Sequence, residues 1–247
     1  RAEITVPADQ QKLLDALKKT GKKIVVLLGT GRAMDLRNEI EKADAVLVTW
    51  HGGTMEGPAV ADLLSGDKNP SGHLTMSFPY CVGQAPIHYS MKTTGRPRKS
   101  PEHDKKYLSR YMYTPNEPLF PFGYGLSYTT FEYGAPVLEK AELSESDVIR
   151  VSFDLKNLGD MEADEVAQLY VKRIDSKVER PLKELEAFDR VALKAGETKN
   201  VTLSFPVSEL SHWDNDTNQW VLEPGKIEIL VGSASNDIRQ TIQTEIK

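Results

Sequence analysis

The stretch Leu119-Phe-Pro-Phe-Gly-Tyr-Gly-Leu-Ser-Tyr-Thr-Thr-Phe131 is the most distinctive part of this 247-residue sequence. It contains five aromatic rings and three residues that interrupt regular structure, Pro121, Gly123 and Gly125. The glycines permit backbone conformations that are closed to other residues, whereas the rings require apolar surroundings. Leaving such a patch in water is unfavourable for a soluble protein. The stretch therefore predicts a buried joint, with the five rings packed between two domains.

Upstream of this joint, helical periodicity alternates with short apolar runs. The runs at residues 23–28 and 45–49 are typical of strands that are buried on both faces of a parallel sheet. The pattern predicts helices over residues 8–20, 33–42 and 58–65, and strands over residues 23–28, 45–49 and 73–78. Alternation of this kind indicates a layered α/β sandwich with a mostly parallel sheet.

Downstream of the joint the pattern becomes all-β. Residues 148–155 alternate between apolar and polar side chains, with Val151, Phe153 and Leu155 on one face. Similar short runs, separated by turns rich in Gly, Pro, Asn and Asp, cover residues 166–171, 187–193, 199–205 and 226–231. This pattern predicts a β-sandwich of the fibronectin type III-like kind.

Composition limits the classes of function. A net charge of −5 without a basic stripe argues against a nucleic-acid surface. No apolar run approaches the about 20 residues that span a bilayer. Cys81 is the only cysteine, so the chain has no internal disulfide, and nothing places a base beside a catalytic thiol. The five histidines show no metal-ligand spacing, so we expect no metal and no cofactor.

The turns that follow the first two predicted strands are the places where ligands usually bind in parallel sheets. They comprise residues 29–32 and 50–56. Glu56 near His51 resembles an acid/base pair, and Trp50 offers a ring for a sugar. The alternative is that Glu56 and His51 shape the start of the next helix and that Trp50 packs between sheet and helix. Residues 29–31 also resemble a phosphate-binding turn, but they lack the full nucleotide fingerprint.

Residues 121–131 closely resemble the junction segment of bacterial β-glucosidases of glycoside hydrolase family 3. Further motifs follow in the order of that family along nearly the whole chain. They include Asn69-Pro-Ser-Gly72, Ser77-Phe-Pro79, Gly95-Arg-Pro97, Glu165-Val-Ala-Gln-Leu-Tyr170, Arg180-Pro-Leu-Lys-Glu-Leu185 and Glu223-Pro-Gly225. On this resemblance the chain is identified as the C-terminal portion of a family 3 enzyme.

The resemblance implies a domain organisation. Residues 1–96 are expected to form the C-terminal part of an α/β sandwich domain, whose earlier strands lie upstream. Residues 97–131 are expected to form a linker and the aromatic junction, and residues 132–247 a fibronectin type III-like domain.

The resemblance also implies retaining hydrolysis, which uses two carboxyl groups. In the family the nucleophilic Asp lies in an N-terminal barrel domain. The acid/base Glu lies just before a run that Arg1-Ala-Glu-Ile-Thr-Val-Pro7 resembles, and Glu3 falls after that position. We therefore expect no catalytic residue here. The implied function is that of a C-terminal fragment of a retaining β-glucosidase, which hydrolyses terminal β-D-glucosyl residues of oligosaccharides or glucosides. The alternative is a non-catalytic carbohydrate-binding or scaffold module.

Residues 82–118 show no periodicity and interleave basic side chains with tyrosines. A loop of this length is uncommon unless it is functional or covers another surface; the alternative is a solvated linker. Tyrosine rings and forked arginine donors suit sugar rings and hydroxyl groups. We expect Arg96, Arg98, Tyr107 or Tyr111 to border the substrate entrance or a dimer contact.

The expected partners are the barrel-containing N-terminal segment of the same enzyme and a β-linked gluco-oligosaccharide. A homodimer is also allowed, whereas no nucleic acid and no membrane is expected as a partner. A periplasmic or secreted location is favoured over the cytoplasm.

Overall fold

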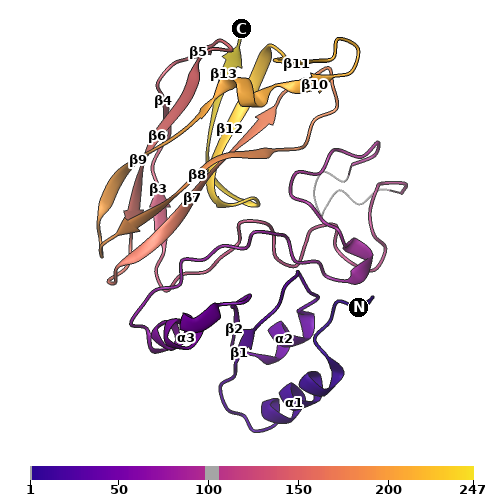
Figure 1. Ribbon diagram of the computed structural model, residues 1–247, viewed down its shortest axis with the longest axis vertical. Helices are drawn as coiled ribbons and strands as arrows, with labels where there is room; N and C mark the ends of the chain where they lie inside the picture. Colours follow the sequence, from indigo (N-terminus) through magenta and orange to yellow (C-terminus); the bar gives the residue numbers. More distant parts are fainter. Residues whose placement is uncertain (1, 98–105) are drawn as a thin grey trace. The chain divides into compact units, whose positions relative to one another are not determined.

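The structure is a computed structural model that describes residues 2–97 and 106–247 (Figure 1). The chain divides into two compact units. The first contains the described residues of Arg1–Lys68, Thr75–His88 and Arg98–Phe122. The second contains Asn69–Leu74, Tyr89–Pro97 and Gly123–Lys247. Each unit is therefore built from segments that are discontinuous in the sequence.

The first unit alternates helices with parallel strands over residues 8–65, which confirms that part of the predicted order. Its strands β1 and β2 pair in parallel, with Val25 opposite Ala45. Its elements are α1 (Ala8–Lys18), β1 (Val25–Leu28), α2 (Arg37–Lys42), β2 (Ala45–Val48), α3 (Glu56–Ser65) and the short 3-10 turns η1 (Gly53–Met55) and η2 (Val82–Gln84). Helix α3 ends at Gly66, whose φ of 84° is readily adopted only by glycine.

Helix α2 is shorter than the helix predicted over residues 33–42, because contacts of Asp35 hold residues 33–36 in a non-helical conformation. Asp35 forms a parallel bridge with Thr5. The Asp35 carboxylate also accepts hydrogen bonds from the Arg37 backbone N–H at 3.2 Å and from Arg37 Nη2 at 2.7 Å. The helix consequently begins at Arg37, and residues 33–36 lie outside it.

The strand predicted over residues 73–78 is wrong, because its backbone pairs with the aromatic stretch and not with the parallel sheet. In the first unit, the Phe78 N–H donates to the Phe120 carbonyl at 2.7 Å, and the Phe120 N–H donates back at 3.2 Å. In the second unit, the Leu74 N–H donates to the Tyr124 carbonyl at 2.8 Å. An apolar pattern marks a segment as extended, but it does not specify which segment its backbone will pair with.

Burial of the predicted parallel strands on both faces is also wrong within the described residues. Leu28 is buried, but Val25 and Leu27 are 46% and 47% exposed. Among residues 2–97 and 106–247, the parallel sheet has the two strands β1 and β2.

The aromatic stretch is only partly buried. Phe131 is buried, but in the core of the second unit, where it begins β3. Phe120, Phe122 and Tyr124 are half-buried, whereas Tyr128 is 55% exposed, so the burial predicted for its ring is wrong. The Tyr128 backbone N–H donates to Asn69 Oδ1 at 3.0 Å, which fixes the chain at this position without burying the ring.

The second unit is a sandwich of two sheets. One sheet has the strand order β5-β13-β12-β7-β8, and the other has the order β3-β6-β4, with β9 also paired to β6. Neighbouring strands are antiparallel, except for the parallel pair β13 and β5. The strands are β3 (Phe131–Tyr133), β4 (Val137–Leu138), β5 (Glu142–Leu143), β6 (Val148–Asn157), β7 (Ala163–Arg173), β8 (Glu184–Leu193), β9 (Thr198–Pro206), β12 (Gly225–Ala234) and β13 (Asp237–Ile246), with the 3-10 turn η3 (Val207–Leu210) and a separate hairpin of β10 (His212–Asp214) and β11 (Gln219–Val221).

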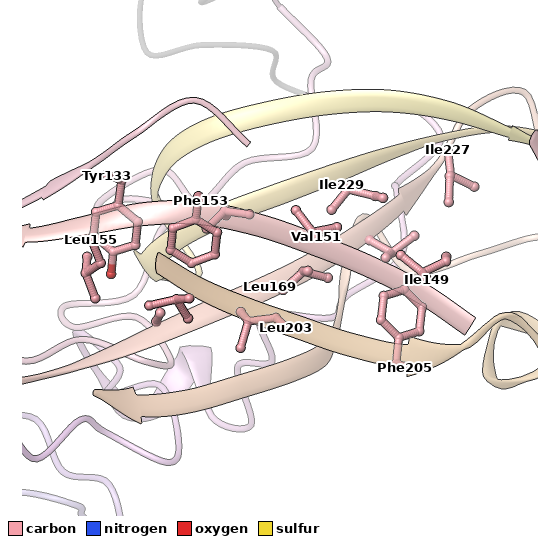
Figure 2. Packing of buried hydrophobic residues seen from close by; sticks show 14 of the residues in the cluster. Tyr133, Ile149, Val151, Phe153, Leu155, Leu169, Leu203, Phe205, Ile227 and Ile229 are labelled. Carbon is pink, nitrogen blue, oxygen red and sulfur yellow. The ribbon is translucent and has the colours of Figure 1, made fainter. Parts of the chain in front are cut away.

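The five strands predicted here are confirmed as β6, β7, β8, β9 and β12. Figure 2 shows the reason for β6: Val151, Phe153 and Leu155 all point into the core, which also contains Ile227 and Ile229 of β12. This is the period-two alternation of a strand with one face on a core. Strand β13 was missed, because its isoleucines stand four residues apart and polar side chains fill the positions between them.

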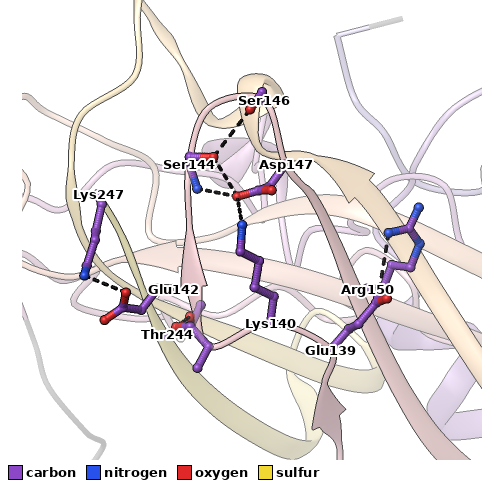
Figure 3. A network of polar contacts seen from close by, with 10 residues as sticks. Glu139, Lys140, Glu142, Ser144, Ser146, Asp147, Arg150, Thr244 and Lys247 are labelled. Atoms are coloured by element: carbon purple, nitrogen blue, oxygen red, sulfur yellow. Dashed lines mark hydrogen bonds and ion pairs between the residues drawn. The ribbon is translucent and has the colours of Figure 1, made fainter.

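The loop before β6 is held by a small polar network (Figure 3). Asp147 accepts hydrogen bonds from Lys140 Nζ at 2.6 Å and from the backbone N–H and hydroxyl of Ser144, each at 2.7 Å. These donors lower the pKa of the Asp147 carboxyl below its usual range. Nearby, Lys247 Nζ contacts Glu142 at 2.6 Å, beside the short pairing of β5 with β13. These polar contacts join neighbouring segments of the chain beside β5, the edge strand of the five-stranded sheet.

Candidate functional site

The turns that follow β1 and β2 meet at one edge, because the two strands are parallel. Trp50 directly follows the end of β2 with a positive φ of 53°, and its ring meets the edge of Phe78 at a centroid distance of 6.0 Å. Glu56 Oε2 accepts a hydrogen bond from the Gly52 N–H at 3.3 Å, immediately before α3. The packing role of Trp50 and the helix-start role of Glu56 are therefore the interpretations that the geometry supports.

This edge does not supply the two carboxyl groups of a glycosidase. Glu56 is the only acidic residue of residues 29–32 and 50–56. Retaining hydrolysis requires two carboxyl groups about 5 Å apart across the scissile bond. This edge therefore lacks the pair of acids that the reaction needs.

A second feature of the first unit was not found from the sequence. A groove of about 800 Å³ is lined by Glu3, Thr5, Val6, Pro7, Ala8, Gln11, Asp35, Arg37, Asn38 and Glu41. Beneath it, the buried Glu39 accepts a hydrogen bond from Gln11 Nε2 at 2.6 Å. Glu39 Oε2 has no hydrogen-bond partner within the described residues. Burial raises the pKa of the Glu39 carboxyl, and the Gln11 hydrogen bond opposes this shift.

The groove can accommodate a polar chain or ligand, but its residues come from two separate segments, residues 3–11 and 35–41. The only signal in the sequence was an acidic residue on the inward side of a short helix. Such a residue is read as a solvated charge unless its burial is known.

The four predicted substrate-binding residues do not form one described cluster. Tyr111 is partly exposed, and its hydroxyl donates to the Gly83 carbonyl at 3.1 Å. Tyr107 is exposed with a φ of 69°, and Lys106 Nζ lies 5.0 Å from its ring centroid. Arg96 is exposed and belongs to the second unit, whereas the two tyrosines belong to the first. Arg98 lies outside the described residues.

A shallow pocket of about 520 Å³ lies beside Tyr111. It is lined by Arg110, Tyr111, Met112, Tyr113, Thr114, Pro115 and Glu117. Its exposed tyrosine rings and basic side chain are of the type that the sequence suggested for sugar contacts.

The first part of the irregular tract is fixed to the β-sandwich. The Tyr89 ring packs edge-on against Tyr170 at 5.7 Å, and its hydroxyl accepts a hydrogen bond from the Leu185 N–H at 3.1 Å. The Leu182 N–H donates to the Met91 carbonyl at 2.9 Å. Residues 89–97 therefore belong to the sandwich unit and do not form a free solvated linker.

No metal site or membrane helix was found in the part of the chain that the structure describes. No group of three or more His, Cys, Asp and Glu side chains is placed to hold a metal ion. No helix there is long and apolar enough to cross a membrane.

Two family models match the chain. The model of the glycosyl hydrolase family 3 C-terminal domain matches residues 1–128, and that of the fibronectin type III-like domain matches residues 165–235. A periplasmic β-glucosidase from Salmonella typhimurium is 42% identical over 240 residues, which are 97% of this chain and 31% of that protein. A β-xylosidase from Formosa agariphila is 39% identical over 248 residues, covering 100% of this chain and 33% of that protein.

Solved structures give the same result. A mutant β-glucosidase from Listeria innocua in complex with laminaribiose superimposes with a TM-score of 0.92 at 39% identity. The match covers 99% of this chain and 33% of that one. The chain thus spans about a third of the length of the relatives it matches.

Proposed function

This chain belongs to glycoside hydrolase family 3, and we propose that it is the C-terminal part of a retaining β-glucosidase. The enzyme would hydrolyse terminal β-D-glucosyl residues of oligosaccharides or glucosides. Its catalytic carboxylates would lie in a preceding barrel-containing segment, and this chain would dock beside them. The observation that carries the proposal is the match of nearly the whole chain to about a third of each β-glucosidase relative.

We expect the 247 residues alone to leave an aryl β-glucoside intact, and we expect turnover when they are combined with the upstream segment of the same enzyme. The physical reason is that retaining hydrolysis needs two carboxyl groups, a nucleophile and an acid/base, and one group cannot fill both roles. The measurement is release of the aryl leaving group by each piece and by the mixture. Turnover by the isolated chain would contradict the proposal, and Glu56→Gln would then be the first variant to test. An inactive mixture that still binds sugar would favour the non-catalytic module.

The remaining organisation is part of the same proposal. The exposed Val25 and Leu27 of β1 support a preceding segment that covers this face of the sheet and completes the layered α/β sandwich. The domain limits along the chain would be 1–96, 97–131 and 132–247, with the segments 69–74 and 89–97 packed in the sandwich unit. The Salmonella relative is a periplasmic β-glucosidase, which supports a periplasmic or secreted location for this chain. The proposed domain organisation is also compatible with a homodimer.

We also propose that Arg96, Arg98, Tyr107 and Tyr111 include residues that border the substrate entrance or a dimer contact. The exposure of Arg96 and Tyr107, and the pocket beside Tyr111, support this role.

In the assembled enzyme, we expect Tyr107→Ala to raise the KM for a gluco-oligosaccharide several-fold, because it removes an exposed ring that is available for stacking. An aryl glucoside with one sugar ring should show a smaller change. Thr93→Ala, on an exposed loop residue of the same tract, is the control. If the KM values for both substrates and the mass in solution stay unchanged in Tyr107→Ala and Arg98→Ala, the tract has no role at the entrance or in a dimer.

A further inference from the structure

The hairpin of β10 and β11, residues 212–221, carries two tryptophans side by side. Trp213 lies directly opposite Trp220 in the antiparallel register, so both rings lie on the same face. Their centroids are 5.8 Å apart, and the ring planes make an angle of 74°. The two residues are 47% and 68% exposed. Adjacent exposed aromatic side chains form an apolar patch of the kind that marks binding surfaces, whereas a single exposed aromatic residue is ordinary.

The other face of the tryptophan hairpin is seated on the sandwich. His212 and Val221, which are paired with each other, are half-buried, and the following Leu222 packs against the hydrophobic core. Side chains alternate between the two faces of a strand. Seating His212 and Val221 therefore directs Trp213 and Trp220 outward.

Two arginines fix both ends of the hairpin. Arg173 of β7 donates to the Glu223 carbonyl at 2.6 Å, just after β11, and to the Leu210 carbonyl at 3.1 Å, just before β10. Arg180 donates to the same Leu210 carbonyl at 3.1 Å. The Glu223 carboxylate in turn accepts hydrogen bonds from the Ser176 hydroxyl and the Lys177 N–H, each at 2.6 Å. Burial lowers the pKa of Arg173, and the neighbouring Arg180 charge adds to this effect.

The tip of the hairpin is also ordered by its own hydrogen bonds. Asp214 accepts from the Asp216 N–H at 3.1 Å and from the Thr217 hydroxyl at 2.7 Å. Asn218 adopts the left-handed conformation with a φ of 52°, which asparagine tolerates in turns. Both the base and the tip are thus fixed before any ligand arrives, so little conformational entropy remains to be lost on binding.

We propose that Trp213 and Trp220 form a binding platform for one or two pyranose rings of a β-linked gluco-oligosaccharide. An indole ring presents an apolar face and an N–H donor, and a β-linked glucose presents an apolar face of C–H groups edged by hydroxyls. The exposed end of the hairpin also carries the polar side chains of Asn215, Asp216 and Gln219. The proposed role is binding without catalysis. It rests on the proposed function only for the choice of a β-linked gluco-oligosaccharide as the ligand.

The size of the platform favours a sugar over a protein partner. A stable protein interface covers about 800 Å² on each partner and surrounds its aromatic anchors with further buried side chains. Here the pair stands on a three-residue-strand hairpin whose tip, residues 215–219, is exposed and polar. The two indole rings, whose planes make an angle of 74°, offer ring-sized apolar faces that suit single pyranose rings.

The test measures binding of laminaribiose to the 247-residue chain by tryptophan fluorescence. The background variant is Trp50→Phe, so that Trp213 and Trp220 are the only indoles that report. We expect a saturable change in emission. Trp213→Ala and Trp220→Ala should each weaken binding about tenfold, similar to the loss of one stacked ring at a nucleic-acid site. The affinity of these variants is measured by isothermal titration calorimetry. Trp220→Phe should retain most of the affinity.

Phe188→Ala is the matched control, because Phe188 is an exposed aromatic on β8 of the same sandwich. It should leave binding unchanged. The proposal would be overturned if the fluorescence signal did not saturate, or if Phe188→Ala weakened binding as much as the tryptophan variants. It would also be overturned if the chain formed a dimer that Trp220→Ala dissociates and sugar had no effect. The outcome is separable from the proposed function. Turnover in the assembled enzyme without sugar binding by this chain refutes the platform alone, and sugar binding without turnover refutes the proposed function alone.

Discussion

Gly123→Ala should lower the free energy of unfolding of the sandwich unit by about 3 kcal/mol, combining the strain of a left-handed alanine with the loss of buried hydrogen bonds. Gly123 has a φ of 81°. An added Cβ would lie 3.0 Å from Gln168 Cδ and closer still to Oε1. Gln168 is 3% exposed and cannot move into solvent without leaving its partners.

Those partners make the site sensitive. Gln168 Nε2 donates to the carbonyls of Gly123, at 3.2 Å, and Ser233, at 2.5 Å, and Gln168 Oε1 accepts from the Tyr170 hydroxyl at 2.5 Å. Displacing the amide leaves buried polar groups unpaired, which costs more than the hydrogen bonds themselves contribute.

Gly196→Ala is the control for this prediction. Gly196 has a φ of 69° in a turn of the same unit, but no atom lies within 4 Å of an added Cβ. This variant should lose only the conformational part, about 1 kcal/mol. The measurement is urea denaturation followed by circular dichroism, with equal m-values required for the comparison. Equal losses in the two variants would mean that Gln168 moves aside without penalty.

Phe153→Ala should lower the free energy of unfolding by about 4 kcal/mol, the typical loss for a phenylalanine removed from a core. Phe153 points into the centre of the sandwich and stacks on Tyr133 at 5.8 Å with nearly parallel planes (Figure 2). The cavity would lie between the two sheets. The strands of each sheet are hydrogen-bonded to their neighbours along most of their length, so the backbone has little freedom to collapse into the cavity.

Thermal and urea unfolding of Phe153→Ala should be compared with those of Phe188→Ala. Phe188 is 66% exposed on β8, and its loss should change stability by less than about 0.5 kcal/mol. A loss below about 1 kcal/mol for Phe153→Ala would show that the sandwich core repacks around the gap.

The sequence by itself determined the elements whose signal is local. Val151, Phe153 and Leu155 alternate because β6 has one face on the core, and Gly66 ends α3 because glycine adopts the left-handed conformation without strain. The motif order was sufficient to identify the family, and on that resemblance the catalytic carboxylates are expected to lie outside these residues. From the sequence, Glu56 had two possible roles, as an acid in catalysis or as a side chain that shapes the start of α3. Its hydrogen bond to Gly52 favours the second role.

Only the tertiary structure decided which distant segments meet. Residues 74–78 pair with residues 120–124, so a run that resembles a strand does not join the parallel sheet. The groove over Glu39, the burial of Gln168 and the outward direction of Trp213 and Trp220 have the same origin. Each depends on long-range hydrogen bonds or on a hairpin register, and these are set by the folded chain as a whole and not by neighbouring residues.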